Sequence, residues 1–464
     1  MNSTCVDTEL MPFDLARSIL AAAVESLSTE SIRLTDALGR IAAESIVAKE
    51  DLVPYPRSAM DGYALRSIDT QAASAATPVE LLLDGKVFTG DGQSTLVTGT
   101  ALGITTGAPV PIGADAVVPL EQVSVRDSKI FVDQPVCVGD CIFPPAEDVR
   151  CGESLLNRGS LIRPANMALL AFAGHSALYV YRRPNVSLLC TGSELVDVSD
   201  TPACGQVRNS NAYSLRALFS ECGANARYCG AVTDNLNELS AALEEARRGA
   251  DLLITTGGAS VGERDLIKSA LEEMGAEFEF RKVAIRPGKP FAFGRWQGLP
   301  VCVLPGNPAA AFVCFHEFIR PLLLRMAGRE RIDLPTVRAT LAGRAKSRLG
   351  SRYVLFGNLS ITRFGFVVEP LDNQCSALVR NPATANALIV LPEGLASYES
   401  GDQVMVQVLN WDSAVQETPI SSVSDSSEYA TLEMTGDSGK FEDSFGEDLR
   451  QHSLDALSVI AITD

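Results

Sequence analysis

Apolar positions near the start of the chain recur at helical intervals. Residues Phe13–Leu27 repeat apolar side chains every three or four positions, which predicts an amphipathic helix. Residues Ser31–Ala48 continue the helical pattern, with a helix end expected at Gly39, because glycine readily adopts the conformation that closes helices. We group residues 1–48 with residues 148–182 as one discontinuous linking region of helices and strands.

Residues 49–147 change to short apolar runs separated by glycine, proline and aspartate. Short apolar runs between turn-forming residues are typical of strands. The expected strands are Leu81–Leu83, Thr100–Thr105, Ala116–Pro119 and Ile130–Val132. This region is therefore predicted to be a small, mostly-β domain.

Residues 183–330 alternate strand-like and helix-like segments. Strands are expected at Val186–Cys190, Ala226–Val232, Leu252–Thr256, Phe278–Ile285, Phe291–Gly294 and Val301–Leu304. Helices are expected at Ala212–Cys222, Leu236–Arg248, Asp265–Met274 and Pro308–Ala327. Such alternation predicts a doubly wound α/β domain, which binds ligands at the carboxyl ends of its strands.

The end of the chain consists of two regions that differ in composition. Residues 331–411 return to short strands and predict a C-terminal β domain. Residues 412–464 carry 12 acidic and 2 basic side chains and are rich in serine, which predicts a disordered acidic tail. The expected fold class is thus multidomain, with a central α/β domain flanked by mostly-β domains.

Composition and charge exclude several classes of function. The 464 residues have a formal net charge of −18, and no basic stretch suits a nucleic-acid backbone, so nucleic acid is not an expected partner. The N-terminus lacks the pattern of a secretory signal, and the longest apolar stretch, near Met167–Tyr181, is too short to span a membrane. We therefore expect a cytoplasmic protein without membrane contacts.

Cysteine and histidine usage narrows the chemistry further. The 11 cysteines include no C-x-x-C pair, which indicates free thiols in a reducing compartment. Cys190, Cys302 and Cys314 lie in apolar runs and are expected in the core. The three histidines are far apart in sequence, which argues against a histidine metal site or a Ser-His-Asp triad.

The segment Thr255–Asp265, with the sequence TTGGASVGERD, follows an apolar strand and precedes an amphipathic helix. Its glycines permit a tight turn with exposed N–H groups, and the helix start adds positive partial charge. Binding of an anion such as phosphate is therefore expected, at Gly257, Gly258, Ser260 and Gly262. The alternative is a plain strand–helix turn capped by Asp265.

Two further segments have the character of binding sites. Arg281–Pro290 holds four cations within nine residues, and strand alternation would place Lys282 and Arg286 on one face, toward a polyanion. The alternative is a solvated edge strand protected by charge. Leu304–Pro308 ends an apolar strand and starts a helix at Pro308, so it is expected at the ligand-binding edge, although a rigid turn would have the same sequence.

Carboxylates form a fourth group. Glu194, Asp234 and Asp265 each follow a strand of one predicted sheet, and Asp61 lies in the block SAMDGYA. Parallel strands would bring the first three to one edge beside the phosphate site. Clustered carboxylates at such a site typically hold Mg²⁺. Taken singly, each carboxylate could equally be a helix cap or a surface charge.

Six segments, in this order, resemble the molybdopterin molybdenumtransferase family, whose relatives include the C-terminal domain of gephyrin. The resemblance runs from about Asp14 to about Val408. The blocks are SAMDGYA at Ser58–Ala64, TGAPVPIGADAVV at Thr106–Val118, TGSEL at Thr191–Leu195, TTGGASVGERD at Thr255–Asp265, RPGKPFAFG at Arg286–Gly294 and LPGNP at Leu304–Pro308. Single blocks also occur in molybdopterin adenylyltransferases.

The resemblance implies a four-part homodimer that joins molybdate to adenylylated molybdopterin with Mg²⁺ and releases AMP. It implies that the linking region dimerises, that the cleft lies between the α/β domain of one subunit and the SAMDGYA domain of the other, and that other cofactor-assembly proteins are partners. The implied catalytic residues are Asp61, Glu194, Asp234, Asp265, Lys282 and Arg286. Of these, the implied metal ligands are Asp234, Asp265 and Glu194. The implied substrate-binding residues are Thr106, Gly257, Gly258, Ser260, Gly262, Lys289, Pro305, Gly306, Asn307 and Pro308.

The chain departs from the family at a few positions. Phe143–Ala146 stands where the family often has arginines before an acidic pair, and Ser193 replaces an aspartate. A molybdopterin adenylyltransferase is one alternative, but it would not need the SAMDGYA or C-terminal β domains. A scaffold that has lost activity is another; the Phe143–Ala146 departure favours it, and retention of all four carboxylates argues against it.

Overall fold

The computed structural model describes residues 10–257, 266–394 and 397–413. It divides into two compact units, Leu27–Arg182 on the one hand and Met1–Ser26 with Arg183–Asp464 on the other. Each unit is described by itself below. The expected region 1–48 is therefore split near residue 26, because the first helix packs with the second of these units. Most of the acidic tail, from residue 414 on, lies outside the described residues.

The linking part of Leu27–Arg182 is built from strands and one helix. Strand β1 (Thr29–Arg33) pairs antiparallel with β12 (Ala177–Tyr181), and β2 (Ile46–Val47) pairs with β11 (Ser154–Leu156). Helix α2 (Pro164–Phe172) covers their shared core. The helix predicted over Ser31–Ala48 is wrong: pairing with a strand almost 150 residues away overrides the local helical spacing. Gly39 has a φ of +72° in a turn.

The β domain of this unit contains a six-stranded sheet. Its order is β7 (Ala116–Pro119), β4 (Gly62–Leu65), β6 (Thr100–Ile104), β5 (Val79–Val87), β9 (Lys129–Val132) and β8 (Val123–Arg126). Strand β3 (Arg57–Ser58) pairs with β10 (Ile142–Phe143) beside it. All four strands expected from the sequence are confirmed, since their alternating apolar residues form two buried clusters.

A second six-stranded sheet forms the α/β domain. Its order is β16 (Asn225–Val232), β13 (Asn185–Thr191), β17 (Leu252–Thr256), β21 (Leu299–Leu304), β20 (Ala292–Trp296) and β18 (Ala276–Phe280). The first four strands are parallel, and β20 is antiparallel to both of its neighbours. The predicted strand Phe278–Ile285 is too long, because the chain leaves the sheet after Phe280.

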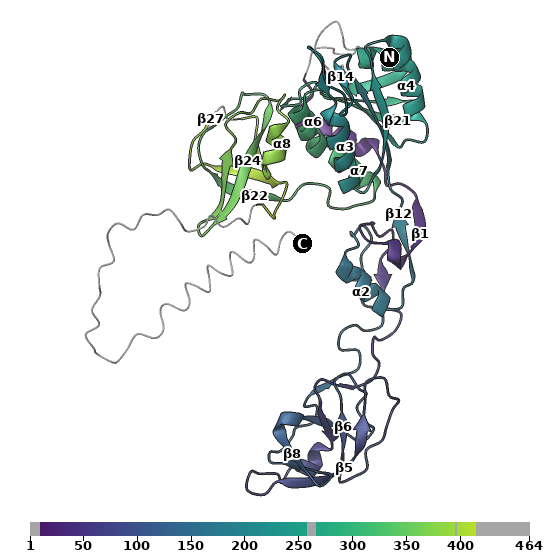
Figure 1. The fold of residues 1–464 in the computed structure, drawn as a ribbon, viewed down its shortest axis with the longest axis vertical. Helices are drawn as coiled ribbons and strands as arrows, with labels where there is room; N and C mark the ends of the chain where they lie inside the picture. Colours follow the sequence, from purple (N-terminus) through teal and green to yellow (C-terminus); the bar gives the residue numbers. More distant parts are fainter. Residues whose placement is uncertain (1–9, 258–265, 395–396, 414–464) are drawn as a thin grey trace, which may run out of the picture. The chain divides into compact units, whose positions relative to one another are not determined.

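Helices cover both faces of this sheet, which confirms the doubly wound prediction (Figure 1). Helices α4 (Leu236–Arg247) and α5 (Leu266–Glu273) bury Leu239, Leu243 and Leu271 in one cluster with Trp296. Helix α3 (Ser210–Glu221) lies on the other side, where its Phe219 ring is 5.9 Å from that of Phe315.

The last predicted helix of this domain, Pro308–Ala327, is present with an interruption. It consists of α6 (Pro308–Cys314), a π-helical turn at Phe315–Ile319 and α7 (Arg320–Met326). Pro321 lacks an N–H group, and a local widening of the helix is a common response to such a residue. Helix α1 (Phe13–Ala23) packs here through Phe13, whose ring lies 5.3 Å from that of Phe318.

The C-terminal part of this unit is the expected β domain. Its main sheet contains β22 (Thr336–Leu341), β24 (Arg352–Thr362), β25 (Gly365–Pro370), β26 (Ala387–Leu391) and β28 (Gln403–Val408), with β19 (Ile285–Arg286) at one edge. A short pair, β23 (Ala345–Lys346) with β27 (Ser397–Tyr398), and helix α8 (Arg380–Thr384) complete it. Within the described ranges, no helix has the length and apolar character needed to cross a membrane.

Candidate active site

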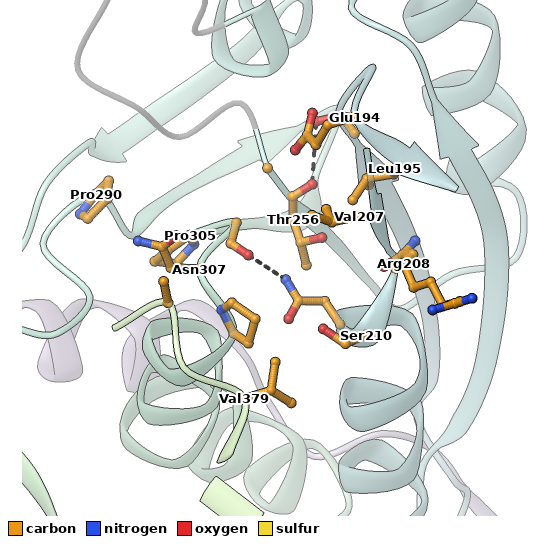
Figure 2. A pocket seen from close by; sticks show the side chains of 17 residues that line it. Glu194, Leu195, Val207, Arg208, Ser210, Thr256, Pro290, Pro305, Asn307 and Val379 are labelled. Carbon is orange, nitrogen blue, oxygen red and sulfur yellow. Dashed lines mark hydrogen bonds between the residues drawn. The ribbon is translucent and has the colours of Figure 1, made fainter. Parts of the chain in front are cut away.

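A pocket of about 540 Å³ lies at the carboxyl ends of β13, β17 and β21 (Figure 2). Two strand–helix turns and the start of α3 form its walls, and residues of the C-terminal domain close one side. The described lining is Thr191, Glu194, Leu195, Val207, Arg208, Asn209, Ser210, Asn211, Thr256, Gly257, Pro290, Pro305, Gly306, Asn307, Pro308, Ala377 and Val379. This position is the one that the alternating sequence pattern predicts for a doubly wound domain.

Strand register explains why distant motifs meet here. Cys190 of β13 lies beside Thr256 of β17, and Thr256 lies beside Leu304 of β21. Because these strands are parallel, the turns that follow them leave the sheet at the same edge. The blocks TGSEL and LPGNP and the segment Thr255–Gly257 are thereby brought together, and the predicted residues Glu194, Gly257, Pro305, Gly306, Asn307 and Pro308 all line the pocket.

Gly257 shows why one of these turns requires glycine. Its φ is +91°, and a Cβ atom there would lie 2.0 Å from the Thr191 carbonyl oxygen. The next turn packs against this one at van der Waals distance, since a Cβ on Gly306 would lie 3.4 Å from the Gly257 Cα. Backbone atoms, and not side chains, therefore form this part of the wall. Gly258, Ser260, Gly262 and Asp265 lie outside the described residues.

The start of α3 forms a wall that the sequence analysis missed. The Asn209 side chain accepts a hydrogen bond from the Ala212 N–H over 3.1 Å and caps the helix. Asn211 donates its Nδ2 to the Gly306 carbonyl over 2.8 Å. These two bonds fix the helix start against the LPGNP turn. The signal was available, because asparagine and serine directly before the predicted helix Ala212–Cys222 are preferred capping residues.

Two of the three predicted metal ligands follow adjacent strands at this edge. Glu194 follows β13 and lines the pocket, and Asp234 follows the adjacent strand β16. The Ser193 hydroxyl joins the two turns, donating to Asp234 Oδ2 over 3.3 Å and accepting from the Asp234 N–H over 3.2 Å. Asp234 itself is not among the described lining residues.

Carboxylate and hydroxyl oxygens are the donors that Mg²⁺ prefers, so the chemistry of Glu194, Asp234 and Ser193 fits that ion. Among the described residues, no three histidine, cysteine, aspartate or glutamate side chains are arranged to hold a metal ion. The third predicted ligand, Asp265, lies outside the described residues.

The expected cationic strand is replaced by a turn. After Phe280 the chain makes backbone bonds to Met11, with the Met11 N–H donating to the Lys282 carbonyl over 3.0 Å, and then forms β19 in the C-terminal sheet. The alternation that was to place Lys282 and Arg286 on one face is therefore wrong. Neither of these residues nor Lys289 is in the described lining of the pocket, although the next residue, Pro290, is.

Asp61 and Thr106 belong to the β domain of Leu27–Arg182, where they contact each other. Thr106 donates its N–H over 2.7 Å and its hydroxyl over 3.0 Å to Asp61 Oδ1. These two bonds, with a smaller contribution from Lys86, hold the pKa of Asp61 below its ordinary value. Asp61 lines a smaller pocket, of about 160 Å³, with Lys86.

Three known protein families together match most of the residues that the structure describes. Residues 11–174 match the family described as "MoeA N-terminal region (domain I and II)", 187–325 match "Probable molybdopterin binding domain", and 338–409 match "MoeA C-terminal region (domain IV)". The molybdopterin molybdenumtransferase of Bacillus subtilis (strain 168) is 36% identical over 387 residues, 82% of this chain and 90% of the relative. The chain belongs to the molybdopterin molybdenumtransferase family.

Other members support the assignment. The molybdopterin molybdenumtransferase of Haemophilus influenzae is 33% identical over 413 residues, 86% of this chain and 99% of the relative. The crystal structure of a molybdopterin biosynthesis MoeA protein from Pyrococcus horikoshii has 32% identity and a TM-score of 0.74, covering 87% of this chain and all of that one. The family resemblance, the multidomain fold class and the assignment to an enzyme, a transferase of molybdenum cofactor biosynthesis, are thus confirmed.

Proposed function

We propose that this protein joins molybdate to adenylylated molybdopterin and releases AMP, in a Mg²⁺-dependent step of molybdenum cofactor biosynthesis. The observation that carries the proposal is the pocket at the carboxyl edge of the α/β sheet, where Gly257, Gly306 and Glu194 meet. The names of the molybdopterin molybdenumtransferases to which the chain is similar point to the same substrate.

The pocket residues can hold such a substrate without forming a covalent bond to it. The N-terminal end of α3, at Ser210 and Asn211, presents positive partial charge to the pocket, which favours phosphate oxygens there. The backbone of Gly257 allows close approach because no side chain covers it. These residues would orient the phosphoanhydride, and orientation alone can supply a large part of a rate enhancement.

Glu194 and Asp234 would provide the charge that holds a divalent cation beside the phosphates, with the Ser193 hydroxyl fixing Asp234. Mg²⁺, when bound, neutralises charge that develops on phosphate oxygens as AMP leaves. Asp61, held ionised by Thr106, would supply a fixed negative charge or a hydrogen-bond acceptor in the transfer.

We further propose that the protein works in the cytoplasm as a homodimer, with other cofactor-assembly proteins as transient partners and with neither nucleic acid nor a membrane. The free thiols support a reducing compartment, since ten cysteines of the described residues are unpaired. Light scattering of the purified protein tests the homodimer: a molar mass near twice 49.4 kDa is expected, and a monomer at assay concentration contradicts it.

The test of the activity is AMP release from adenylylated molybdopterin in the presence of Mg²⁺, with and without molybdate. We expect release that requires molybdate, with molybdenum bound to the pterin product in equal amount. ATP with unmodified molybdopterin is the matched alternative substrate, because an adenylyltransferase would consume it. Folded protein that releases no AMP under any of these conditions would overturn the proposal and favour a scaffold.

A further inference from the structure

A lysine stands beside Asp61 in the pocket of about 160 Å³ on the β domain. Asp61, Gly62 and Tyr63 form one side of this pocket, and Lys86 with Gly85 and Gly103 forms another. The Lys86 side chain is exposed and forms no ion pair with any described residue. The pocket thus contains one carboxylate with a partner, Asp61, and one cation without a carboxylate partner.

Two features of the backbone direct Lys86 toward this pocket. The pairing of β5 with β6 shifts register between Leu83 and Lys86, an irregularity that re-aims side chains on a strand. Lys86 lies opposite Gly103, and a Cβ on that glycine would lie only 3.1 Å from Lys86 Cγ. The missing side chain of Gly103 therefore leaves the space that the Lys86 stem occupies.

The end of the stem is held as well. Lys86 Nζ lies 5.0 Å from the centre of the Phe88 ring, within the range of a cation–π contact. The segment is tied to the neighbourhood of Asp61, because Thr89 donates its hydroxyl to the Thr106 carbonyl over 2.6 Å and its N–H to Thr105 Oγ1 over 3.0 Å. An ammonium group restrained in this way loses less conformational entropy on meeting a ligand than a freely moving lysine does.

We propose that Lys86 is a further substrate-binding residue, which contacts an oxyanion in the Asp61 pocket. Asp61 alone would repel an anion, and the two donors from Thr106 satisfy only one of its oxygens. Lys86 offsets the remaining repulsion and provides the opposite charge that an oxyanion needs. The proposed reaction involves two kinds of oxyanion that could bind here, molybdate and the phosphate groups of the nucleotide. The inference rests on the proposed function for its choice of ligands.

The two charges in the pocket predict opposite effects on binding. Lys86→Met, which keeps the stem and removes the charge, should weaken oxyanion binding by about two- to fivefold, as loss of one exposed ion pair does. Asp61→Asn, which removes the repulsion, should tighten it. Titration calorimetry with molybdate and, separately, with AMP measures which of the two ligands binds through Lys86. Lys86→Arg should restore most of the affinity.

Lys129→Met is the matched control, because Lys129 is a half-exposed lysine of the same sheet that pairs with Glu80. It should leave both affinities unchanged, and the unfolding temperatures of the lysine variants should stay close to that of the original protein. In the transfer assay, Lys86→Met should raise the KM for the affected ligand more than it lowers kcat.

Equal affinities for Lys86→Met, Lys129→Met and the unsubstituted protein, for both ligands, would overturn the inference. That outcome is distinct from failure of the proposed function. A protein that binds an oxyanion through Lys86 but releases no AMP keeps this site and loses the function. A protein that transfers molybdenum regardless of residue 86 keeps the function and loses this site.

Discussion

Thr106 donates both its backbone N–H, over 2.7 Å, and its hydroxyl, over 3.0 Å, to a single carboxylate oxygen of Asp61. The two residues are 45 positions apart and come from the two sequence blocks SAMDGYA and TGAPVPIGADAVV. Their contact joins the two blocks: one supplies the carboxylate, and the other fixes its position and lowers its pKa. Asp61 Oδ2 receives no hydrogen bond from Thr106 and can meet a ligand.

This contact predicts a pH effect. In Thr106→Val the hydroxyl donor is lost and the backbone donor remains, so the pKa of Asp61 should rise part of the way toward its ordinary value. Under the proposed mechanism Asp61 acts as the ionised form, so the acid limb of the transfer rate should move to higher pH, while the rate at neutral pH changes little. Carbon-13 NMR titration of the aspartates gives the same pKa directly. An acid limb that stays in place would show that Asp61 does not set it.

The sign of the matching stability effect follows from the depressed pKa. A carboxylate whose pKa is lowered by folding stabilises the native state above its unfolded pKa, and this stabilisation is lost as the pH falls through the folded pKa. Thr106→Val should therefore reduce stability mainly above pH ~4, the ordinary value for aspartate, with a smaller difference in stronger acid. Urea unfolding of both proteins at several pH values between about 2 and 7 measures this difference in the free energy of unfolding.

Gly257 is predicted to tolerate no side chain. Gly257→Ala should destabilise the protein by roughly 3 kcal/mol, because it combines a left-handed backbone with a Cβ clash against the Thr191 carbonyl. Gly249→Ala is the control: its φ is +68° and nothing lies within 4 Å of the new Cβ, so only the backbone cost of about 1 kcal/mol applies. Denaturant unfolding compares the two. Equal losses would mean that the Gly257 turn can move away from β13.

The parts of this site that local sequence patterns determine were predictable, and the parts that depend on contacts between distant segments were not. The strands of the α/β domain were predictable because buried parallel strands are continuous apolar runs, and the edge where Glu194 and Gly257 meet follows from that topology. The exit of the chain at Arg281–Ala284 was not predictable, since it depends on bonds to Met11. Ala377 and Val379 reach the pocket only through packing of the C-terminal domain, for which the sequence gives no periodic signal.

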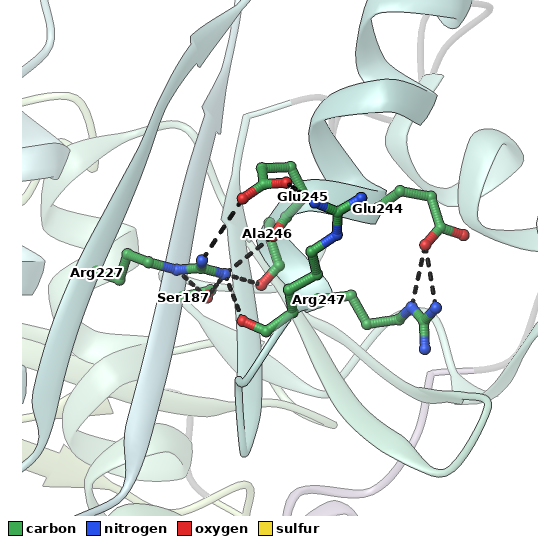
Figure 3. Close-up of polar contacts among 7 residues, drawn as sticks. Ser187, Arg227, Glu244, Glu245, Ala246 and Arg247 are labelled. Carbon is green, nitrogen blue, oxygen red and sulfur yellow. Dashed lines mark hydrogen bonds and ion pairs between the residues drawn. The ribbon is translucent and has the colours of Figure 1, made fainter.

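Arg227 is predicted to stabilise the fold without affecting chemistry. Its guanidinium donates to the carbonyls of Glu245, Ala246 and Arg248 over 3.0, 2.7 and 2.9 Å, and to Ser187 Oγ, so that it closes the C-terminal end of α4 (Figure 3). Arg227→Met should cost roughly 1–2 kcal/mol, because charged donors at several helix carbonyls are lost.

Arg248→Gln is the control for Arg227→Met. The Arg248 side chain pairs with Glu245 at 2.8 Å but is 74% exposed, so its loss should change the free energy of unfolding by less than about 0.5 kcal/mol. The transfer rate per folded molecule should be unchanged in both variants. A specific loss of transfer in Arg227→Met would instead connect this end of α4 to the site near Asp234.

Thiol chemistry gives a further prediction. Cys137, Cys151, Cys204 and Cys375 are exposed and should react with iodoacetamide at pH 8, whereas the buried Cys190, Cys302 and Cys314 should not. Burial raises the pKa of Cys222 to about 11, so this half-buried thiol should react slowly and speed up only as the pH approaches that value. Peptide mass spectrometry locates the modified residues. Rapid labelling of Cys302 or Cys314 would contradict the packing of the α/β core.

Glu194 is the carboxylate that lines the pocket at the carboxyl edge of the α/β sheet, where we propose that molybdenum transfer occurs. The measurement is molybdate-dependent AMP release by the unsubstituted protein and by Glu194→Gln, at saturating Mg²⁺ and with unfolding temperatures compared. We predict release that requires molybdate in the first and a loss of about a hundredfold or more in the second, with the fold unchanged. Full activity in Glu194→Gln would contradict the account, because the carboxylate that faces the pocket would then have no part in the transfer.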